Sequence, residues 1–460
     1  MSPGDILTVK ISSINSEGEG LARIGDEAFV LFVPGALPGE TVSCRVTRLS
    51  KKYASARVLE ILSHSPSRIT PKCPQYGDCG GCQLQHANYE TQIEIKRTIL
   101  TDALKRIGHI EPPGGVICEP SPERWGYRNK TTLPVRGVGK AGKNALSCGY
   151  YERRTHNVVS FWKCAVLRPS LEKIIPIAID AIAGAGFKGY NEAKKTGDIR
   201  HFAARTGSCG EVLTGIVASR EFSARESGKL KNAVQRLCQE YSELAGAVLN
   251  VKTDTDNFIW GPVFKPLGGA RFVEQRFGAL RFNVDISSFF QVNSAQTEVM
   301  FNYVKKHIKA SSTSRLLELY SGVGSLTSFL AGAAEKVDAV EEWRPAARQL
   351  RENMLINSIE NVEIHSDSAE KFLESGRHAS AGAYDTIVLD PPRTGCDERV
   401  TSRILQISPR DIIYVSCDPA TLARDISRLV AGGYSLESVA AFDMFPQTAH
   451  VESVTVMSRE

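Results

Sequence analysis

The sequence predicts an α/β fold for the C-terminal part of the chain, built on a doubly wound parallel sheet of the Rossmann type. Three observations support this prediction. Strand and helix patterns alternate regularly from about residue 313 onward. A glycine-containing turn joins the first of these strands to the helix that follows it. The chain has 460 residues, too many for one hydrophobic core, so further domains are expected before this one.

Composition is that of a globular protein, with 42% hydrophobic and 23% charged residues. The sequence contains no apolar run of 18 residues and does not begin with a basic and then apolar leader. We therefore expect a cytoplasmic protein with no membrane segment. The net charge of +5 is compatible with a nucleic-acid partner but is too small to establish one.

Residues 1–62 consist of short β-rich runs separated by turn sequences, which predicts a small N-terminal β-barrel of the oligonucleotide-binding type. Basic residues gather within this segment. A solvated strand face and an RNA-binding surface explain them equally well. They are Arg45, Arg48, Lys51, Lys52 and Arg57.

Residues 63–285 mix strand and helix patterns and are expected to form an α+β middle domain. Apolar residues at helical spacing predict a helix over 88–108, which can pack on the C-terminal domain. Two more helices are expected at 169–186 and 223–241. The C-terminal domain is expected to span 286–460, with its last two strands, 434–442 and 451–457, forming a hairpin at the sheet edge.

Gly322 and Gly324 lie between the first strand and first helix of the C-terminal domain, where the backbone can approach a ligand closely. An ordinary strand–helix turn would look the same. Glu341 ends the next strand, about twenty residues later, where an acid can bind ribose hydroxyls. Thr327 replaces the third glycine of the dinucleotide fingerprint, which favours an adenosine ligand such as S-adenosylmethionine over NAD.

Asp390 and Cys417 end the fourth and fifth predicted strands. Parallel strands bring such residues to the sheet edge that binds ligands. Asp390 could instead cap the following helix. A thiol at the start of a helix has a pKa below about 8.5, which makes Cys417 a candidate nucleophile rather than a small buried hydrophobe.

A thiolate would suit methylation of uracil, because addition to C6 turns C5 into a nucleophilic carbon. A base must afterwards remove the proton from C5. Glu452 is a candidate for that base. Taken alone, it is better explained as an exposed strand residue.

Cys73, Cys79 and Cys82 have the spacing C-x₅-C-x₂-C, among glycines that let the backbone wrap around a metal. An iron–sulfur cluster and zinc suit this spacing about equally. A fourth ligand must come from elsewhere in the chain, and Cys118, Cys148 and Cys164 are the candidates.

Four motifs, LELYSGVGS, VLDPPRTG, VSCDPATLARD and HVES, closely resemble those of the RNA 5-methyluridine methyltransferases in order and spacing. The resemblance covers nearly the whole chain, and the N-terminal barrel is similar to a TRAM domain. It implies that Cys417 is the nucleophile and Glu452 the base. The ligands it implies are S-adenosylmethionine and RNA.

The resemblance also assigns binding residues. Phe289, in the FFQVN motif, is expected to stack near the flipped base. The cofactor- and uracil-pocket residues are expected to be Gln291, Tyr320, Gly322, Ser325, Glu341 and Asp390. Glu318 and Ser321 depart from the Asp and Cys of many members. After the third strand, Asp367 and Ser368 stay equal candidates for a cofactor contact.

For the cysteines, the resemblance favours a [4Fe–4S] cluster held by Cys73, Cys79, Cys82 and Cys164. Arg128 and Lys130 are expected to contact RNA. Large-subunit (23S) ribosomal RNA is favoured as the substrate over the T loop of transfer RNA, and a monomer is expected.

Two other functions fit part of the sequence. A radical methylthiotransferase can also combine an iron–sulfur cluster with a TRAM domain. That class resembles a cysteine spacing of C-x₃-C-x₂-C, whereas the spacing here is C-x₅-C-x₂-C. A non-catalytic RNA-binding or folding factor has no need of both Cys417 and Glu452.

Overall fold

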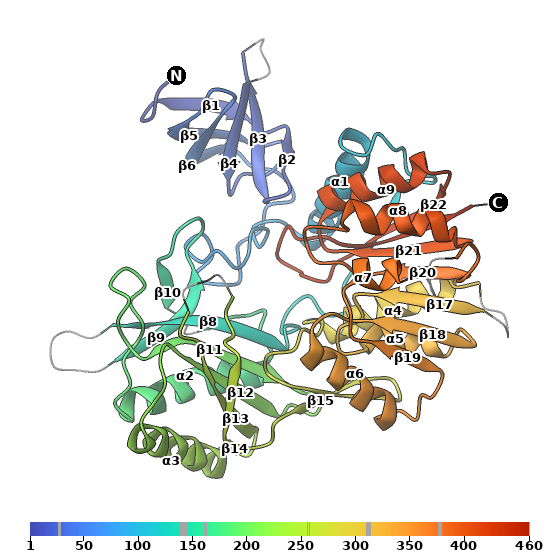
Figure 1. Ribbon diagram of the computed structural model, residues 1–460. Coiled ribbons are helices and arrows are strands. Elements are labelled where there is room, and N and C mark those ends of the chain that lie inside the picture. The colour runs from blue at the N-terminus through green and yellow to red at the C-terminus, as the bar shows by residue number, and fades with distance from the viewer. Residues whose placement is uncertain are drawn as a thin grey trace. The chain divides into compact units, whose positions relative to one another are not determined.

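The computed structural model describes residues 1–25, 29–138, 145–160, 163–254, 256, 258–309, 314–375 and 380–459 (Figure 1). The chain forms two compact units. The first comprises Met1–Ser121, Pro392–Cys396 and Val415–Met457, and the second Pro122–Pro391, Asp397–Tyr414 and Ser458–Glu460. The predicted domain boundaries at residues 62 and 285 stay predictions.

The N-terminal part of the first unit is a curled six-stranded sheet in the order β1-β5-β6-β4-β3-β2. Its core consists of alternate residues of the strands, such as Leu31, Val33 and Val42, which are fully buried. The strands are β1 (Ile6–Lys10), β2 (Ser13–Ile14), β3 (Glu19–Ile24), β4 (Phe29–Pro34), β5 (Thr41–Leu49) and β6 (Tyr53–Ser63).

The five basic residues noted in the barrel sequence are all exposed on or between β5 and β6. Arg45 pairs across the two strands with Arg57, so the cations form a strip on this hairpin. Buried Glu40 accepts hydrogen bonds from Arg68 Nε at 2.6 Å and Leu37 N at 2.8 Å, which fastens the following linker to the barrel.

Helix α1 (Tyr89–Arg106) confirms the helix predicted over this stretch, and the side chain of Asn88 caps its start by accepting a hydrogen bond from Thr91 N at 2.9 Å. Its buried face is partly polar. Lys96 Nζ lies 2.5 Å from Asp443 Oδ1, and both side chains are fully buried. The pair joins α1 to the segment that follows strand β22 (Ser435–Phe442).

The second unit contains a seven-stranded sheet in the order β10-β9-β8-β11-β12-β13-β14. Adjacent strands are antiparallel except for the parallel pair β12 and β13. The strands are β8 (Lys130–Gly137), β9 (Leu146–Tyr151), β10 (Val158–Ser160), β11 (Ile199–Thr206), β12 (Val212–Ala218), β13 (Leu244–Val251) and β14 (Val263–Gly269).

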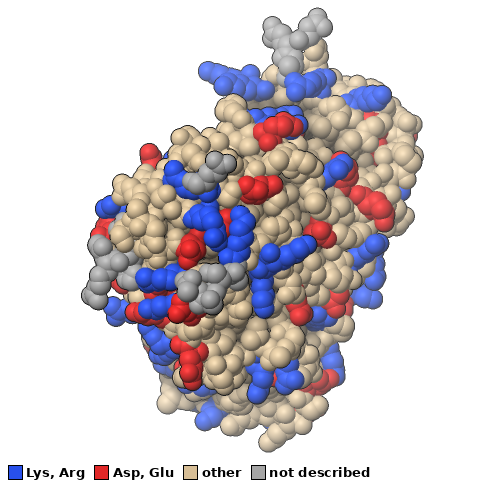
Figure 2. Space-filling view, turned by 90° about the vertical axis from the view of Figure 1, so that its right-hand side faces the viewer, with Lys and Arg blue, Asp and Glu red and all other residues tan. Residues whose placement is uncertain are grey.

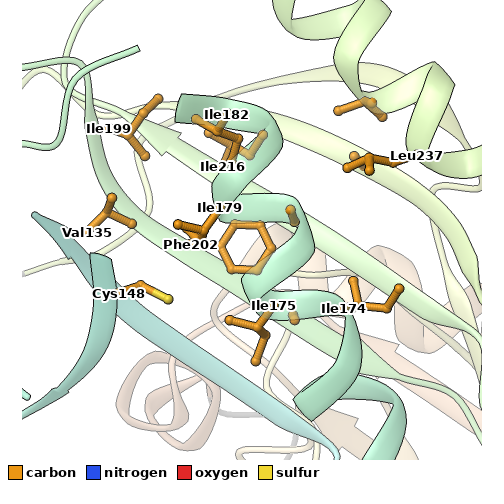
Figure 3. Close-up of a cluster of buried hydrophobic side chains, with 14 of the residues drawn as sticks. Val135, Cys148, Ile174, Ile175, Ile179, Ile182, Ile199, Phe202, Ile216 and Leu237 are labelled. Carbon is orange, nitrogen blue, oxygen red and sulfur yellow. The ribbon is translucent and has the colours of Figure 1, made fainter. Parts of the chain in front are cut away.

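Helices α2 (Pro169–Gly184) and α3 (Ala224–Glu240) confirm the two helices expected in this region. They cover the sheet through one apolar cluster. Figure 3 shows Ile175 and Ile179 of α2 beside Phe202 of β11 in this cluster. Burying such side chains stabilises the fold by about 1.5–3 kcal/mol each.

The C-terminal sheet has eight strands in the order β19-β18-β17-β20-β21-β23-β22-β7. The run from β19 to β21 is parallel, which confirms the doubly wound fold. The strands are β17 (Arg315–Leu319), β18 (Lys336–Val340), β19 (Val362–His365), β20 (Thr386–Leu389), β21 (Asp411–Ser416), β22, β23 (Glu452–Ser458) and β7 (Val116–Glu119).

Helices of this fold pack in pairs: α4 contacts α5, α7 contacts α8, and α1 contacts α9. Their bounds are α4 (Ser294–His307), α5 (Ser325–Ala331), α6 (Arg344–Ile356), α7 (Ala369–Glu374), α8 (Glu398–Ile407) and α9 (Pro419–Ala431). A short hairpin, β15 (Val273–Phe277) and β16 (Leu280–Val284), precedes α4.

The final hairpin does not form the sheet edge as expected. Strand β7 pairs in parallel with β22, with Val116 opposite Val439, and therefore covers that edge. Four residues are too few to give a strand pattern that the sequence could reveal.

In the described part of the chain, every helix is too short or too polar to span a bilayer. Figure 2 shows one face of the molecule, on which Lys and Arg side chains gather over part of the surface with Asp and Glu among them.

We expect Lys96→Met to lower the free energy of unfolding by about 3–5 kcal/mol, because it leaves the Asp443 carboxylate buried without its cation. Chemical denaturation measures the change. Arg97→Met is the matched control on the same helix, since its ion pair with Glu94 is exposed and worth less than about 1 kcal/mol. Equal losses in the two variants would contradict this account.

Candidate active site

The glycine turn after β17 has the backbone shape expected of a ligand-binding turn. Tyr320, Gly322 and Gly324 have φ of 67°, 57° and 85°. A Cβ at Gly324 would lie 2.9 Å from Leu350 Cγ, so close packing as well as backbone shape requires glycine there. Ser325 begins α5 immediately after this turn.

Glu341 follows β18 and reaches back to the glycine turn. Its carboxylate accepts hydrogen bonds from Gly322 N at 2.8 Å and Trp343 N at 2.7 Å. Burial raises the pKa of Glu341 despite these bonds. The carboxylate is thus fixed beside the turn.

Two more carboxyls lie in the same region. Burial raises the pKa of Glu318 to about 8, and the nearby charges of Asp390 and Glu341 add to that effect. Burial also raises the pKa of Asp390, which follows β20, to about 7. Glu318 Oε2 is buried and has no hydrogen-bond partner among the described residues. A grouping of three carboxyls is unfavourable by itself and suits a cationic ligand.

The predicted base-stacking and cofactor residues Phe289 and Gln291 share the loop before α4. Phe289 is 68% exposed, whereas its neighbour Phe290 is buried and stacks on Phe277 at 5.4 Å between ring centroids. Gln291 is buried, and its carbonyl accepts a hydrogen bond from Asn129 Nδ2 at 3.1 Å. The buried residues of the loop therefore fix its backbone, and the Phe289 side chain points outward.

Lys130 supports this loop from β8. Its Nζ donates to the carbonyls of Ser287 at 3.4 Å and Ser288 at 3.0 Å. Burial and the charge of Arg205 hold the pKa of Lys130 well below its ordinary value. Arg205, opposite Lys130 in β11, also donates to the Ser288 carbonyl at 2.5 Å. Arg128 Nε donates to the Lys130 carbonyl at 3.0 Å.

Sequence reasoning missed Arg205. Its importance depends on the register that places it opposite Lys130, and no sequence pattern reveals a register between distant strands. Glu318 was noted only for departing from the family residue, although its burial at a strand end is a sign of a constrained site.

Ser368 caps α7, because its hydroxyl accepts a hydrogen bond from Lys371 N at 3.4 Å. Its neighbour Asp367 is exposed. Of the two candidates left open by the sequence, Asp367 thus has the carboxylate available to a ligand.

In the first unit, Cys417 directly follows β21 and is half-buried. Asp418 caps α9 by accepting hydrogen bonds from Ala420 N and Thr421 N, each at 3.0 Å. These two N–H groups of the first helical turn therefore point to the Asp418 carboxylate.

Glu452 begins β23 and is buried, not exposed. Its neighbour Ser453 donates a hydrogen bond from Oγ to the carbonyl of Ser416 at 3.1 Å. Ser416 is in turn the neighbour of Cys417. The end of β21, which precedes the predicted nucleophile, therefore lies beside the start of β23, which carries the predicted base.

Cys73, Cys79 and Cys82 share a loop in the first unit and are all half-buried. Cys79 Sγ accepts a hydrogen bond from Gly81 N at 3.4 Å. Burial raises the pKa of Cys79, and the nearby Cys73 adds to this. Half-buried thiols in a glycine-containing loop are of the residue type that binds zinc or an iron–sulfur group as thiolates. Cys164 lies in the second unit, before α2, and donates its N–H to Glu172 Oε1 at 3.2 Å.

Asp338, Glu363 and His365 are also close enough to bind a metal ion. Asp338 accepts hydrogen bonds on both oxygens, from His365 Nε2 at 2.8 Å and from Tyr384 OH at 3.1 Å. We interpret the group as a hydrogen-bond network that joins β18 and β19.

Comparison with known proteins gives the decisive observation. The tRNA (uracil-5-)-methyltransferase family model matches residues 273–460, and the TRAM domain model matches residues 2–59. The chain is 37% identical over 460 residues to an uncharacterized RNA methyltransferase of Gloeobacter violaceus, covering 99% of this chain and 97% of that one. The chain belongs to the RNA (uracil-5) methyltransferase family.

Other relatives agree. An uncharacterized RNA methyltransferase of Halalkalibacterium halodurans is 34% identical, with 99% of this chain and 98% of the relative covered. The crystal structure of the Pyrococcus abyssi tRNA (uracil-54, C5)-methyltransferase in complex with S-adenosyl-L-homocysteine has a TM-score of 0.75 and 25% identity, and covers 98% of this chain and 100% of that one. The protein is thus an S-adenosylmethionine-dependent RNA uracil-5 methyltransferase.

We expect the affinity of this methyltransferase for S-adenosylmethionine to fall about tenfold from pH 8 to pH 6. Asp390 has a pKa of about 7, so it becomes neutral as the pH falls and would no longer attract a sulfonium cation bound beside it. Calorimetric titration measures the dissociation constant.

S-adenosylhomocysteine, which lacks the sulfonium charge, is the control ligand, and its affinity should change much less. In Asp390→Asn the difference between the two ligands should depend less on pH, and the part that persists comes from Glu318, whose pKa is about 8. A parallel pH dependence for both ligands in the wild-type protein would contradict the prediction.

Proposed function

We propose that this methyltransferase modifies C5 of a specific uridine in large-subunit (23S) ribosomal RNA, with Cys417 as nucleophile and Glu452 as base. The observation that carries the mechanism is the hydrogen bond between Ser453 and Ser416, the neighbours of these two residues. Glu452 is buried, and a buried carboxylate is better suited to act as a general base than an exposed one.

In the proposed reaction, Cys417 Sγ bonds to C6 of uracil, and the C5–C6 π electrons move toward the O4 carbonyl. C5 then attacks the methyl carbon of S-adenosylmethionine, and the bond between the methyl carbon and the sulfonium sulfur breaks. Glu452 removes the C5 proton, the C5–C6 double bond forms again, and the bond from C6 to Cys417 Sγ breaks. The thiolate is regenerated, and the proton stays on Glu452 until water takes it.

The carboxyls of the glycine turn support a site for S-adenosylmethionine, since this ligand carries sulfonium and ammonium charges. Glu341, fixed beside Gly322, is proposed to bind the ribose. Asp390 and Asp367 are proposed to contact the rest of the cofactor. The other proposed contacts are Gln291, Tyr320, Gly322 and Ser325.

Access of the nucleophile to C6 requires that the uridine be flipped out of the RNA stack. Exposed Phe289 is proposed to stack beside the flipped base. The basic strip on β5 and β6, with Arg128, is proposed to bind phosphates. Lys130 is proposed to act through the loop that it supports rather than by touching RNA.

We favour ribosomal RNA because of the combination of a TRAM barrel with the proposed four-cysteine cluster. A second candidate, the T loop of transfer RNA, is favoured by the likeness to the Pyrococcus abyssi enzyme. We propose a cytoplasmic monomer in either case.

We predict that Cys417→Ala transfers no methyl label, whereas Glu452→Gln keeps the methylated RNA covalently bound and turns over at least about 100-fold more slowly. Denaturing gels detect the bound RNA, with S-adenosylmethionine labelled in the methyl group and 23S or transfer RNA from cells lacking the gene. The matched control is Cys209→Ala, an exposed thiol, with unchanged turnover.

Label confined to transfer RNA would overturn the proposed substrate but keep the chemistry. Full turnover by Cys417→Ala would overturn the mechanism.

We also propose that Cys73, Cys79, Cys82 and Cys164 hold a [4Fe–4S] cluster, which would cross-link distant parts of the chain. Protein purified without oxygen should then contain about four iron and four sulfide ions per chain. Cys73→Ala and Cys164→Ala should each lose them.

Cys118→Ala and Cys148→Ala are the matched controls, because these cysteines were the other candidates for the fourth ligand. Both should retain iron. One zinc ion per chain instead of iron would contradict the cluster assignment.

A further inference from the structure

Gln447 occupies an unusual place in the turn between β22 and β23. It is 3% exposed and has φ of 74°, in the left-handed region that side chains with a Cβ rarely adopt. Such a conformation persists only where the surroundings fix it, and it is found often at functional sites. The turn ends at Glu452, the proposed base.

Four hydrogen bonds fix Gln447. Its N–H donates to Gln92 Oε1 at 2.9 Å, and its Oε1 accepts from Gln92 Nε2 at 3.0 Å. Its carbonyl accepts from Gln83 N at 3.1 Å and Leu84 N at 2.9 Å. Gln92 belongs to α1, while Gln83 and Leu84 directly follow Cys82. One residue thus joins the turn to both α1 and the cysteine loop.

The cysteine loop makes a second contact with the turn. Gln83 Oε1 accepts a hydrogen bond from Ala449 N at 3.4 Å, and Gln83 Nε2 donates to Gly80 O at 2.8 Å. Gln83 therefore bridges the loop between Cys79 and Cys82 to a residue three positions before Glu452. We call Gln83, Gln92 and Gln447 the glutamine clamp.

Beyond the clamp, the chain to Glu452 is held at close intervals. Thr448 Oγ1 donates to the Phe445 carbonyl at 2.8 Å and accepts from His450 N at 3.3 Å. Ser453 bonds to the Ser416 carbonyl, beside Cys417. Glu452 thus lies on a short segment fastened at one end by the clamp and at the other by the nucleophile strand.

We propose that the glutamine clamp positions Glu452 for removal of the C5 proton, so that the cysteine loop and α1 control release of the methylated RNA. The clamp residues are positioning residues, since they act through the turn and not on the substrate. This inference rests on the proposed function, in which Glu452 acts after methyl transfer.

The order of the steps distinguishes this proposal from a loss of protein stability. Only a displaced base would slow adduct decay without slowing methyl transfer. Attack by Cys417 and methyl transfer precede proton removal, so a displaced Glu452 leaves them unaffected. The bond between Cys417 Sγ and C6 would then persist. Loss of fold would instead slow both steps together.

The test is Gln92→Met in the full-length protein, a change that keeps side-chain length and removes the hydrogen bonds to Gln447. In a single turnover with methyl-labelled S-adenosylmethionine, methyl transfer should stay within about twofold of the wild-type rate. Decay of the protein–RNA adduct, followed on denaturing gels, should slow at least about tenfold.

A second variant, Gln447→Gly, tolerates the left-handed backbone but removes the side-chain bond. It should also slow adduct decay, by less than Gln92→Met does. The matched control is Thr101→Val on the same helix as Gln92, which removes the hydrogen bond from Thr101 Oγ1 to the Arg97 carbonyl at 2.8 Å and leaves the turn and the cysteine loop untouched. Its adduct should decay at the wild-type rate.

Two results separate the clamp from the proposed function. If Glu452→Gln accumulates an adduct but Gln92→Met decays at the wild-type rate, the clamp proposal is wrong and the mechanism stands. If Glu452→Gln accumulates no adduct, the mechanism itself is wrong. Equal slowing of transfer and decay in Gln92→Met would make the clamp merely structural and overturn the proposal.

Discussion

Three carboxyls gathered around one glycine turn are the constraint on which the proposed cofactor site depends. Glu318 and Asp390 have raised pKa values because the fold withdraws them from water, and the charges of Asp390 and Glu341 make Glu318 harder still to ionise. A fold selected for stability alone would avoid this grouping. A cation at the turn relieves it, and the reactive group of S-adenosylmethionine is a cation. The repulsion among these carboxylates would therefore favour binding of a cation at the turn.

The proposed catalytic residues depend on a second constraint. The turn before Glu452 is fixed by residues that are far from it in sequence. The segment from Asp443 to Glu452 is held by α1 through Lys96 and Gln92 and by the cysteine loop through Gln83. These contacts are polar and buried, so each is costly unless every partner is present. Such a network specifies one arrangement of the base more sharply than apolar packing would. Under the proposal it would also give the cysteine loop a part in catalysis without requiring it to touch RNA.

Much of this architecture could be predicted from the sequence. The parallel strands, the helix at residues 89–106 and the glycine turn all have strong local patterns, and the structure confirms them. What could not be predicted depends on partners distant in the chain. Lys96 and Gln92 lie on a face of α1 that a helical pattern assigns to apolar residues, and their partners are about 350 residues away. Arg205 and strand β7 were missed for the same reason, because register and strand neighbours are set by tertiary structure.

The most direct test of the central claim is a mass-spectrometric map of 5-methyluridine in ribosomal and transfer RNA. It should use cells with and without this gene that carry no second gene of the family. The account predicts that 5-methyluridine disappears from one position of 23S ribosomal RNA, and that the wild-type gene restores it while Cys417→Ala does not. Unchanged 5-methyluridine in both RNA pools would contradict the claim that this protein methylates uridine in RNA.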